Sequence, residues 1–124
     1  MTALTILILE DEPLIRMDLE MVAEDAGWTP WPAGHLETAM KLLDAGAPDT
    51  AILDLNLGNG VTSRAVAERL HAAGIPFVIL TGDHHTDMSW LQTMGAPILR
   101  KPHMANDVIR IVAGLAEQAR LRRA

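Results

Sequence analysis

Residues 6–11 read Ile-Leu-Ile-Leu-Glu-Asp, so two carboxylates follow directly on a run of four apolar residues. A short run of branched apolar residues without alternating polar ones is typical of a strand that is buried on both faces. The acidic pair, Glu10 and Asp11, therefore stands where a buried strand ends. This abrupt change predicts a polar site at one edge of a sheet.

Three further apolar runs also lead into polar residues. The run 51–53 ends at Asp54, the run Phe-Val-Ile-Leu before Thr81 ends at that hydroxyl, and a short run leads to Lys101. Because the carboxyl ends of parallel strands lie at the same edge of a sheet, we expect these side chains to converge. Carboxylates bind hard dications, and hydroxyl and ammonium groups bind phosphoryl oxygens. The sequence thus predicts a magnesium and phosphoryl site.

Segments of helical period separate the apolar runs, and a glycine follows each of the first three segments. We expect helices that stop at Gly27, Gly46 and Gly74, and a last helix that includes residues 108–119. The segment 82–94 has the weakest helical period of the chain. It predicts a short helix that can move.

The fold class follows from this alternation of strands and helices. Residues 28–32 read Trp-Thr-Pro-Trp-Pro, and two prolines confine this second strand to a sheet edge. We expect an α/β fold of the doubly wound, flavodoxin-like type, with a five-stranded parallel sheet in the order 2-1-3-4-5. In that order the crevice lies between the first and third strands, where Glu10, Asp11 and Asp54 would meet.

Composition limits the classes of protein to consider. The chain has 124 residues, which suits one domain over residues 1–124, and a formal net charge of −6. The absence of cysteine excludes disulfides and thiolate metal sites. The negative charge argues against a nucleic-acid partner, and no apolar stretch is long enough for a membrane helix. We therefore expect a cytoplasmic protein with no export signal.

The polar residues at the strand ends resemble the receiver domain of bacterial two-component response regulators. The resemblance covers essentially the whole chain and rests on Glu10-Asp11, Asp54 with Asn56, Thr81-Gly82 and Lys101-Pro102, in this order. The chain also resembles the subfamily whose fourth strand reads Phe-Ala-Thr-Gly. It departs from that subfamily at residues 79–80, Ile-Leu, and at Asp83, where an aromatic residue is usual.

The resemblance implies a stand-alone phosphoacceptor without an output domain. Asp54 would take a phosphoryl group from a phosphohistidine, on a sensor histidine kinase or a histidine phosphotransfer protein, and become an acyl phosphate. Glu10, Asp11, Asp54 and the backbone carbonyl of Asn56 would hold Mg²⁺. A protein of this kind is not an enzyme for external substrates, because it catalyses only its own phosphorylation and autodephosphorylation.

The resemblance also implies roles for the remaining motif residues. Thr81 and Lys101 would contact the transferred phosphoryl group, and we expect the Lys101 contact to form mainly after phosphorylation. Replacing Lys101 should then leave the unmodified fold undisturbed. Gly82 and Asp83 would border the access path, and Pro102 would follow Lys101 in the cis peptide bond typical of the family.

The switch position of the family lacks its aromatic residue here. Most receivers carry Tyr or Phe three residues before the lysine, where this chain has Ile98. We therefore expect the segment from Thr81 to Trp90, and not Ile98, to carry the conformational change. The signal would leave through contacts with a downstream protein, through a homodimer, or by competition for phosphoryl groups as a phosphate sink in a phosphorelay.

Simpler interpretations compete with each assignment. Glu10 and Asp11 could begin a helix, where acidic residues suit the dipole, and Asp54 could be a solvated strand end. Two other classes of protein also compete. A haloacid dehalogenase-type phosphohydrolase has an Asp nucleophile but needs a second Asp where this chain has Asn56. A flavodoxin-type binder needs a glycine-rich loop after the first strand, where the acidic pair stands.

Overall fold

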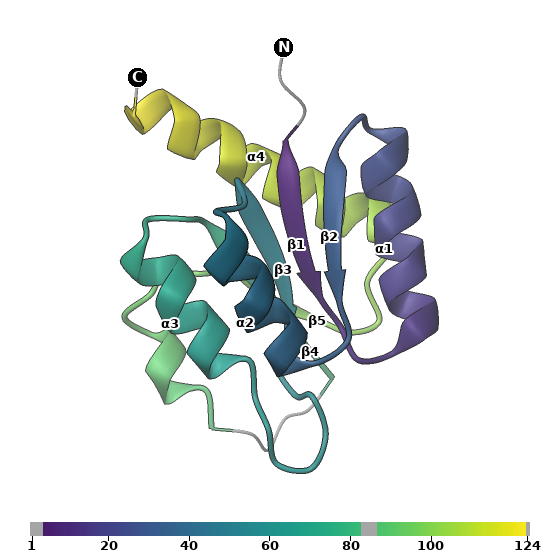
Figure 1. The fold of residues 1–124 in the computed structure, drawn as a ribbon, viewed down its shortest axis with the longest axis vertical. Helices are drawn as coiled ribbons and strands as arrows, with labels where there is room; N and C mark the ends of the chain where they lie inside the picture. Colours follow the sequence, from purple (N-terminus) through teal and green to yellow (C-terminus); the bar gives the residue numbers. More distant parts are fainter. Residues whose placement is uncertain (1–3, 83–86, 124) are drawn as a thin grey trace.

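The described part of the chain forms one five-stranded parallel sheet with helices on both faces (Figure 1). The computed structural model describes residues 4–82 and 87–123. The strands are β1 (Thr5–Leu9), β2 (Thr29–Ala33), β3 (Thr50–Asp54), β4 (Phe77–Thr81) and β5 (Ile98–Arg100). The helices are α1 (Pro13–Asp25), α2 (Leu36–Ala45), α3 (Arg64–Ala72), the 3₁₀ turn η1 (Ser89–Leu91) and α4 (Ala105–Arg123).

The strand order is β2-β1-β3-β4-β5, which confirms the predicted fold and places the proline-containing β2 at an edge. In the parallel register Leu9 lies opposite Leu53, and Asp54 lies opposite Leu80. The sheet order reverses between β1 and β3, so the ends of these two strands border a crevice. This register brings the acidic residues after β1 to the level of Asp54.

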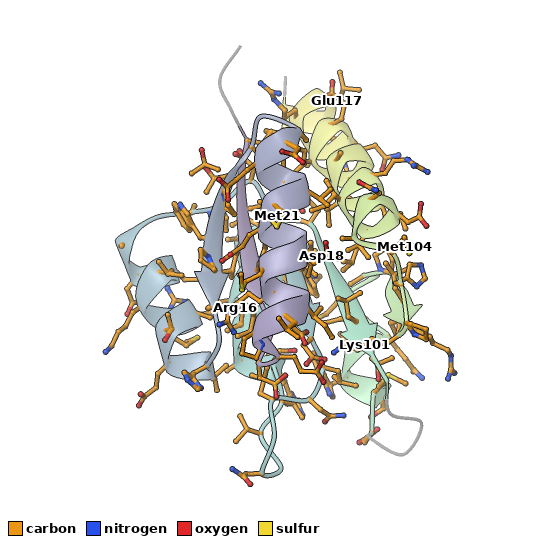
Figure 2. All side chains as sticks on the ribbon, turned by 90° about the vertical axis from the view of Figure 1, so that its right-hand side faces the viewer. Arg16, Asp18, Met21, Lys101, Met104 and Glu117 are labelled. Carbon is orange, nitrogen blue, oxygen red and sulfur yellow. The ribbon has the colours of Figure 1, made fainter. Side chains whose placement is uncertain are left out.

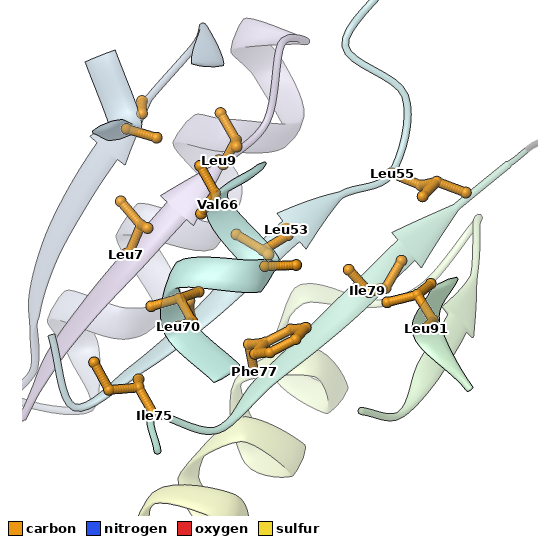
Figure 3. Packing of buried hydrophobic residues seen from close by; sticks show 14 residues of the cluster. Leu7, Leu9, Leu53, Leu55, Val66, Leu70, Ile75, Phe77, Ile79 and Leu91 are labelled. Carbon is orange, nitrogen blue, oxygen red and sulfur yellow. The ribbon is translucent and has the colours of Figure 1, made fainter. Parts of the chain in front are cut away.

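Burial on both faces explains why the strands read as continuous apolar runs. Leu7 and Leu9 of β1 belong to a cluster with α2, α3 and η1, whereas Ile6 and Ile8 belong to a cluster with α1 and α4. Figure 1 shows α2 and α3 in front of the sheet and α4 behind it, and Figure 3 shows the first cluster from close by. Each fully buried Leu or Ile contributes about 1.5–3 kcal/mol. The packed sheet therefore fixes the positions of the residues that follow its strands.

The predicted helix ends agree with the structure. Gly27 and Gly74, which follow α1 and α3, have φ values of 86° and 72°. Glycine adopts such left-handed conformations without steric cost, so it terminates a helix readily. Gly46 follows α2 in an extended conformation instead, with φ 179°.

The connection between β4 and β5 contains only the single turn η1 in its described part, residues 87–97, where we expected a short helix. Leu91 is buried in the cluster of Figure 3, which anchors the turn. The guanidinium of Arg64, at the start of α3, lies 5.7 Å from the ring centre of Trp90. This distance suits a cation–π contact. Met88, Trp90, Met94 and Ala96 also pack against that cluster, so the turn is held to the core by apolar contacts and to α3 by the ring contact.

Candidate functional site

The predicted site residues stand at neighbouring strand ends. Glu10 follows β1, Asp54 is the last residue of β3, and Lys101 follows β5. Backbone hydrogen bonds continue the sheet up to these positions, from Glu10 N to the Ala33 carbonyl at 3.0 Å and from Lys101 N to the Thr81 carbonyl at 2.8 Å. The backbone of each residue is thus fixed by the sheet.

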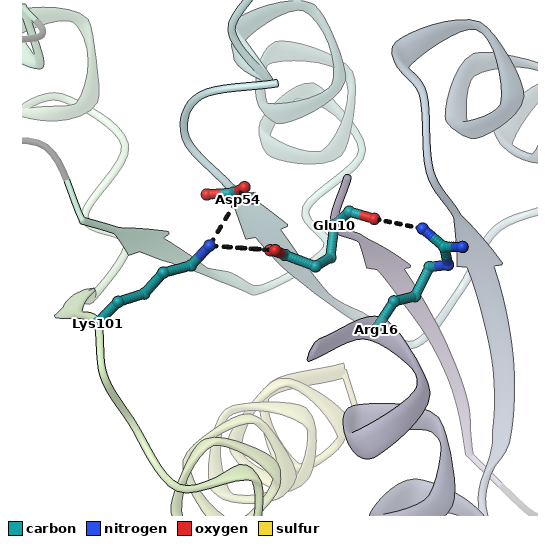
Figure 4. A network of polar contacts seen from close by, with 4 residues as sticks. All are labelled: Glu10, Arg16, Asp54 and Lys101. Atoms are coloured by element: carbon teal, nitrogen blue, oxygen red, sulfur yellow. Dashed lines mark hydrogen bonds and ion pairs between the residues drawn. The ribbon is translucent and has the colours of Figure 1, made fainter. Parts of the chain in front are cut away.

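Lys101 joins two acidic side chains in the unmodified protein (Figure 4). Its Nζ lies 3.1 Å from Glu10 Oε1 and 3.4 Å from Asp54 Oδ2. The Glu10 side chain is fully buried, and a buried carboxylate needs such a partner because removing its hydration costs several kcal/mol. Lys101 thus already has two partners in the unmodified protein, and its contact with a phosphoryl group stays a prediction. The ammonium group is already part of the structure that holds Glu10.

Three carboxylates converge at this edge. Glu10, Asp11 and Asp54 each offer an oxygen, and these oxygens all lie within 4.8 Å of one another. Glu10 and Asp54 are buried, whereas Asp11 is exposed. With the Lys101 ammonium beside them, the three carboxylates carry a formal net charge of −2 (3 × −1, +1). Oxygen ligands, close spacing and this charge fit a hard dication that enters from solvent.

The electrostatic surroundings of Asp54 would favour a bound cation. Burial raises the pKa of its carboxyl from 3.8 to about 8, assisted by the charge of Glu10 and a hydrogen bond with the Asp11 side chain, while Lys101 opposes the shift. The pKa of Lys101 is lowered by burial but raised more strongly by Asp54 and Glu10, so it lies above 10.5. A bound dication would restore the Asp54 carboxylate by favouring its charged form.

Two further predicted residues lie next to this site. Asn56 stands two residues after β3 and pairs with Thr62 in an antiparallel bridge, which turns the chain back towards α3. Thr81 is buried at the end of β4. The metal contact of the Asn56 carbonyl and the phosphoryl contact of Thr81 remain predictions, because both depend on groups that bind from solution.

Of the residues expected along the access path, the structure describes Gly82 and Pro102. Gly82 is exposed, and a Cβ built on it would lie 3.8 Å from the Lys101 side chain, which is an ordinary contact distance. The peptide bond between Lys101 and Pro102 is cis. Asp83 lies outside the described residues. Ile98 is 42% exposed on the edge strand β5, so this position offers no buried pocket to a side chain.

Sequence reasoning missed Arg16. From the second turn of α1 its Nη1 donates a 2.8 Å hydrogen bond to the backbone carbonyl of Glu10 (Figure 4). The sequence held only a weak signal, an arginine on a helix that directly follows the acidic pair. Arginines on helix surfaces are too common for that position to indicate a role.

The structure is that of a receiver domain: a five-stranded parallel sheet with a buried aspartate, a paired lysine and an acidic cluster where the strand order reverses between β1 and β3. The sequence relatives agree. No protein-family model matches the chain. The transcriptional regulatory protein PdtaR of Mycobacterium tuberculosis is 34% identical over 107 residues, which are 84% of this chain and 52% of PdtaR. The chain thus spans about half the length of the curated relatives it matches.

Solved structures give the same result. SdrG from Sphingomonas melonis is 40% identical and superimposes with a TM-score of 0.75, over 94% of this chain and 99% of SdrG. A CheY-like response regulator receiver domain protein from Methanospirillum hungatei reaches a TM-score of 0.85 at 16% identity, over 98% of this chain and 99% of that protein. The chain belongs to the response-regulator receiver family.

Membership in this family makes the chain a signalling protein and implies a phosphoacceptor function. Response-regulator receivers interact with histidine kinases or phosphotransfer proteins. The comparisons therefore favour this class over the phosphohydrolase and flavodoxin-type alternatives. Among the described residues, no helix has both the length and the apolar character needed to cross a membrane.

Proposed function

We propose that Asp54 is the phosphoacceptor and takes its phosphoryl group from a phosphohistidine. One Asp54 carboxylate oxygen attacks phosphorus, the P–N bond of the donor breaks, and the imidazole leaves with the electron pair. The product is an acyl phosphate on Asp54. The observation that carries this proposal is the convergence of Lys101 and two further carboxylates on Asp54 at the end of β3.

The acidic cluster suits Mg²⁺ as the cofactor. Glu10, Asp11, Asp54 and the Asn56 carbonyl would hold the ion, and the charge and spacing of the three carboxylates support this donor set. When bound, Mg²⁺ supplies positive charge that offsets the charge on the transferring oxygens. Lys101 adds a second positive charge beside Asp54, and the Thr81 hydroxyl would donate to a phosphoryl oxygen.

The receiver then acts through its state of modification. It catalyses only its own phosphorylation and autodephosphorylation, and it signals by altered contacts with a downstream protein, by forming a homodimer, or by serving as a phosphate sink. The donor is a sensor histidine kinase or a histidine phosphotransfer protein. The acidic net charge of −6 suits protein contacts better than contacts with nucleic acid. We expect a cytoplasmic location.

Phosphorylation by acetyl phosphate, followed by intact mass spectrometry, tests the proposal. The wild-type protein should gain one phosphoryl group in the presence of Mg²⁺ and much less in its absence. Asp54→Asn should gain none, because the amide is not a nucleophile. Asp44→Asn, on the exposed surface of α2, is the matched control and should react as the wild type does. A phosphorylated Asp54→Asn protein would refute the assignment.

A further inference from the structure

Arg16 contacts the site through the backbone and not through the acidic side chains. Its Nη1 donates to the Glu10 carbonyl at 2.8 Å, and the carbonyl belongs to the peptide unit that joins Glu10 to Asp11 (Figure 4). Arg16 is half-buried on α1, and Figure 2 shows it with the other side chains of that helix. It therefore touches the one peptide plane that both acidic residues share.

The position of this hydrogen bond follows from where β2 ends. The Glu10 N–H donates to the Ala33 carbonyl of β2, at 3.0 Å. Because the N–H and C=O of one strand residue point to the same side, the Glu10 carbonyl is also directed towards β2. However, β2 ends at Ala33. Arg16 supplies the donor where the ladder stops, which satisfies a backbone acceptor at a buried residue.

Gly34 leaves the space for this contact. A Cβ built on Gly34 would lie 2.9 Å from Arg16 Nη1 and 3.5 Å from Arg16 Cζ. The first distance is shorter than the contacts that real Cβ atoms make. The φ of Gly34 lies outside the left-handed region, so the backbone itself accepts other residues here. Alanine at this position would displace the tip of Arg16 without straining the chain. Gly34 and Arg16 thus form one unit.

Asp11 is the residue that most needs this support. Glu10 is held by burial and by Lys101, whereas Asp11 is exposed and its side chain shares a hydrogen bond with Asp54. The direction in which Asp11 meets Asp54 then also depends on the peptide that precedes Asp11. A hydrogen bond from a planar, permanently charged guanidinium restrains that peptide firmly.

We propose that Arg16, in the space left by Gly34, is a positioning residue that fixes the Glu10–Asp11 peptide and so sets both carboxylates for metal binding. The proposal rests on the proposed function, because it requires a metal ion at the acidic cluster. The proposal predicts the sign of the effect of Arg16 on metal affinity. A positive charge near the cluster repels a dication, so a purely electrostatic Arg16 would weaken metal binding, whereas a positioning Arg16 strengthens it.

The test measures two quantities as a function of Mg²⁺ concentration, the thermal stabilisation of the unphosphorylated protein and the rate of its phosphorylation by acetyl phosphate. Arg16→Ala and Gly34→Ala should each raise the half-saturating Mg²⁺ concentration by about 10-fold, as losses of residues that orient metal ligands do. The rate at saturating Mg²⁺ should stay within about twofold of wild type, because the reacting groups are intact. The double variant should resemble Arg16→Ala, because both changes remove the same contact.

Matched controls separate this effect from general changes. Arg110→Ala removes an exposed arginine from α4, and Gly114→Ala adds a methyl group that meets no atom within 4 Å. Both should keep the wild-type Mg²⁺ dependence. Melting temperatures measured without metal show whether each variant folds. If Arg16→Ala does not fold, Gly34→Ala alone tests the proposal, because this change moves only the flexible tip of the Arg16 side chain.

Three outcomes would overturn the proposal. They are an unchanged Mg²⁺ dependence in folded Gly34→Ala, tighter Mg²⁺ use in Arg16→Ala, and additive effects in the double variant. A wild-type protein that is phosphorylated without regard to Mg²⁺, or not at all, would instead refute the proposed function itself. The two failures are therefore distinguishable.

Discussion

At the scale of residues, Glu10 and Asp54 share one positive charge. Lys101 Nζ is 3.1 Å from Glu10 and 3.4 Å from Asp54, and both carboxyl groups are buried. One ammonium group cannot fully compensate the charges of two buried carboxylates. Burial and the charge of Glu10 therefore raise the pKa of Asp54 to about 8. The proposed phosphoacceptor is thus a carboxyl group whose charged form is disfavoured by its surroundings.

Asp54→Asn should stabilise the metal-free protein. The folded-state pKa of about 8 lies above the ordinary value of 3.8, so wild-type stability is fully retained below pH 4 and falls as pH rises towards 8. The variant does not titrate at this position. Its advantage should therefore grow from pH 4 to pH 8 and exceed about 1 kcal/mol at the upper end. Urea unfolding at several pH values measures it, and a pH-independent difference would contradict the shifted pKa.

Lys101→Ala should destabilise the unmodified protein. The change leaves Glu10 fully buried with a charge that has lost its partner, which costs about 3–5 kcal/mol for a broken buried pair. Lys41→Ala, on the exposed face of α2, is the matched control and should change the free energy of unfolding by less than about 0.5 kcal/mol. Equal stabilities of the two variants would show that Lys101 is not needed before phosphorylation.

At the scale of elements, the connection after β4 is the one strand-to-strand connection whose described part contains no α-helix. Its described helical turn, η1, has three residues, and the connection leads to a three-residue edge strand, β5. Leu91 and its apolar neighbours hold this connection to the core, and the Arg64–Trp90 contact joins it to α3. Segments with few buried contacts open most easily, so a change at Thr81 can reach this connection at low cost.

We expect the switch to use this connection and not Ile98. Ile98→Val should cost less than about 0.5 kcal/mol because the side chain is 42% exposed, whereas Ile79→Val, at the buried position opposite, should cost about 0.5–1.5 kcal/mol. In hydrogen exchange, Mg²⁺ with beryllofluoride should alter protection of residues 87–94 in wild type and in Ile98→Val alike. A response confined to β5 and α4 would show that the strand carries the switch.

At the scale of the whole molecule, metal binding at the proposed site would be linked to folding. The acidic cluster joins residues from β3 and from the β1–α1 connection, so Mg²⁺ would bind only the folded chain with full affinity. Mg²⁺ at 100 times its dissociation constant should therefore stabilise the protein by about 2.7 kcal/mol, and a chelator should reverse this. Thermal unfolding with and without Mg²⁺ measures the effect.

Asp11→Asn should reduce this stabilisation, because a dication's affinity depends on the charge of its ligands. Asp18→Asn, at an exposed position of α1 outside the cluster, is the matched control and should retain it (Figure 2). If both variants keep the full Mg²⁺ effect, Asp11 is not a ligand.

Local patterns in the sequence were enough to predict the sheet, its strand order and the convergence of the acidic residues. Runs buried on both faces require parallel strands with helical crossovers, and the two prolines of β2 leave only an edge position for that strand. Once the strands are parallel, residues that follow them must meet at one edge. The convergence of Glu10, Asp11 and Asp54 was therefore predictable from local patterns alone.

The contacts that hold these residues could be seen only in the folded structure. The contact between Lys101 and Glu10 spans 91 positions of the chain, and the contact of Arg16 with Glu10 depends on the space above Gly34. Neither leaves a periodic pattern in the sequence, because each depends on the reach of one side chain between elements that pack together only in the folded state. Local patterns specify which residues reach the edge of the sheet, but packing decides which of them are paired and buried there.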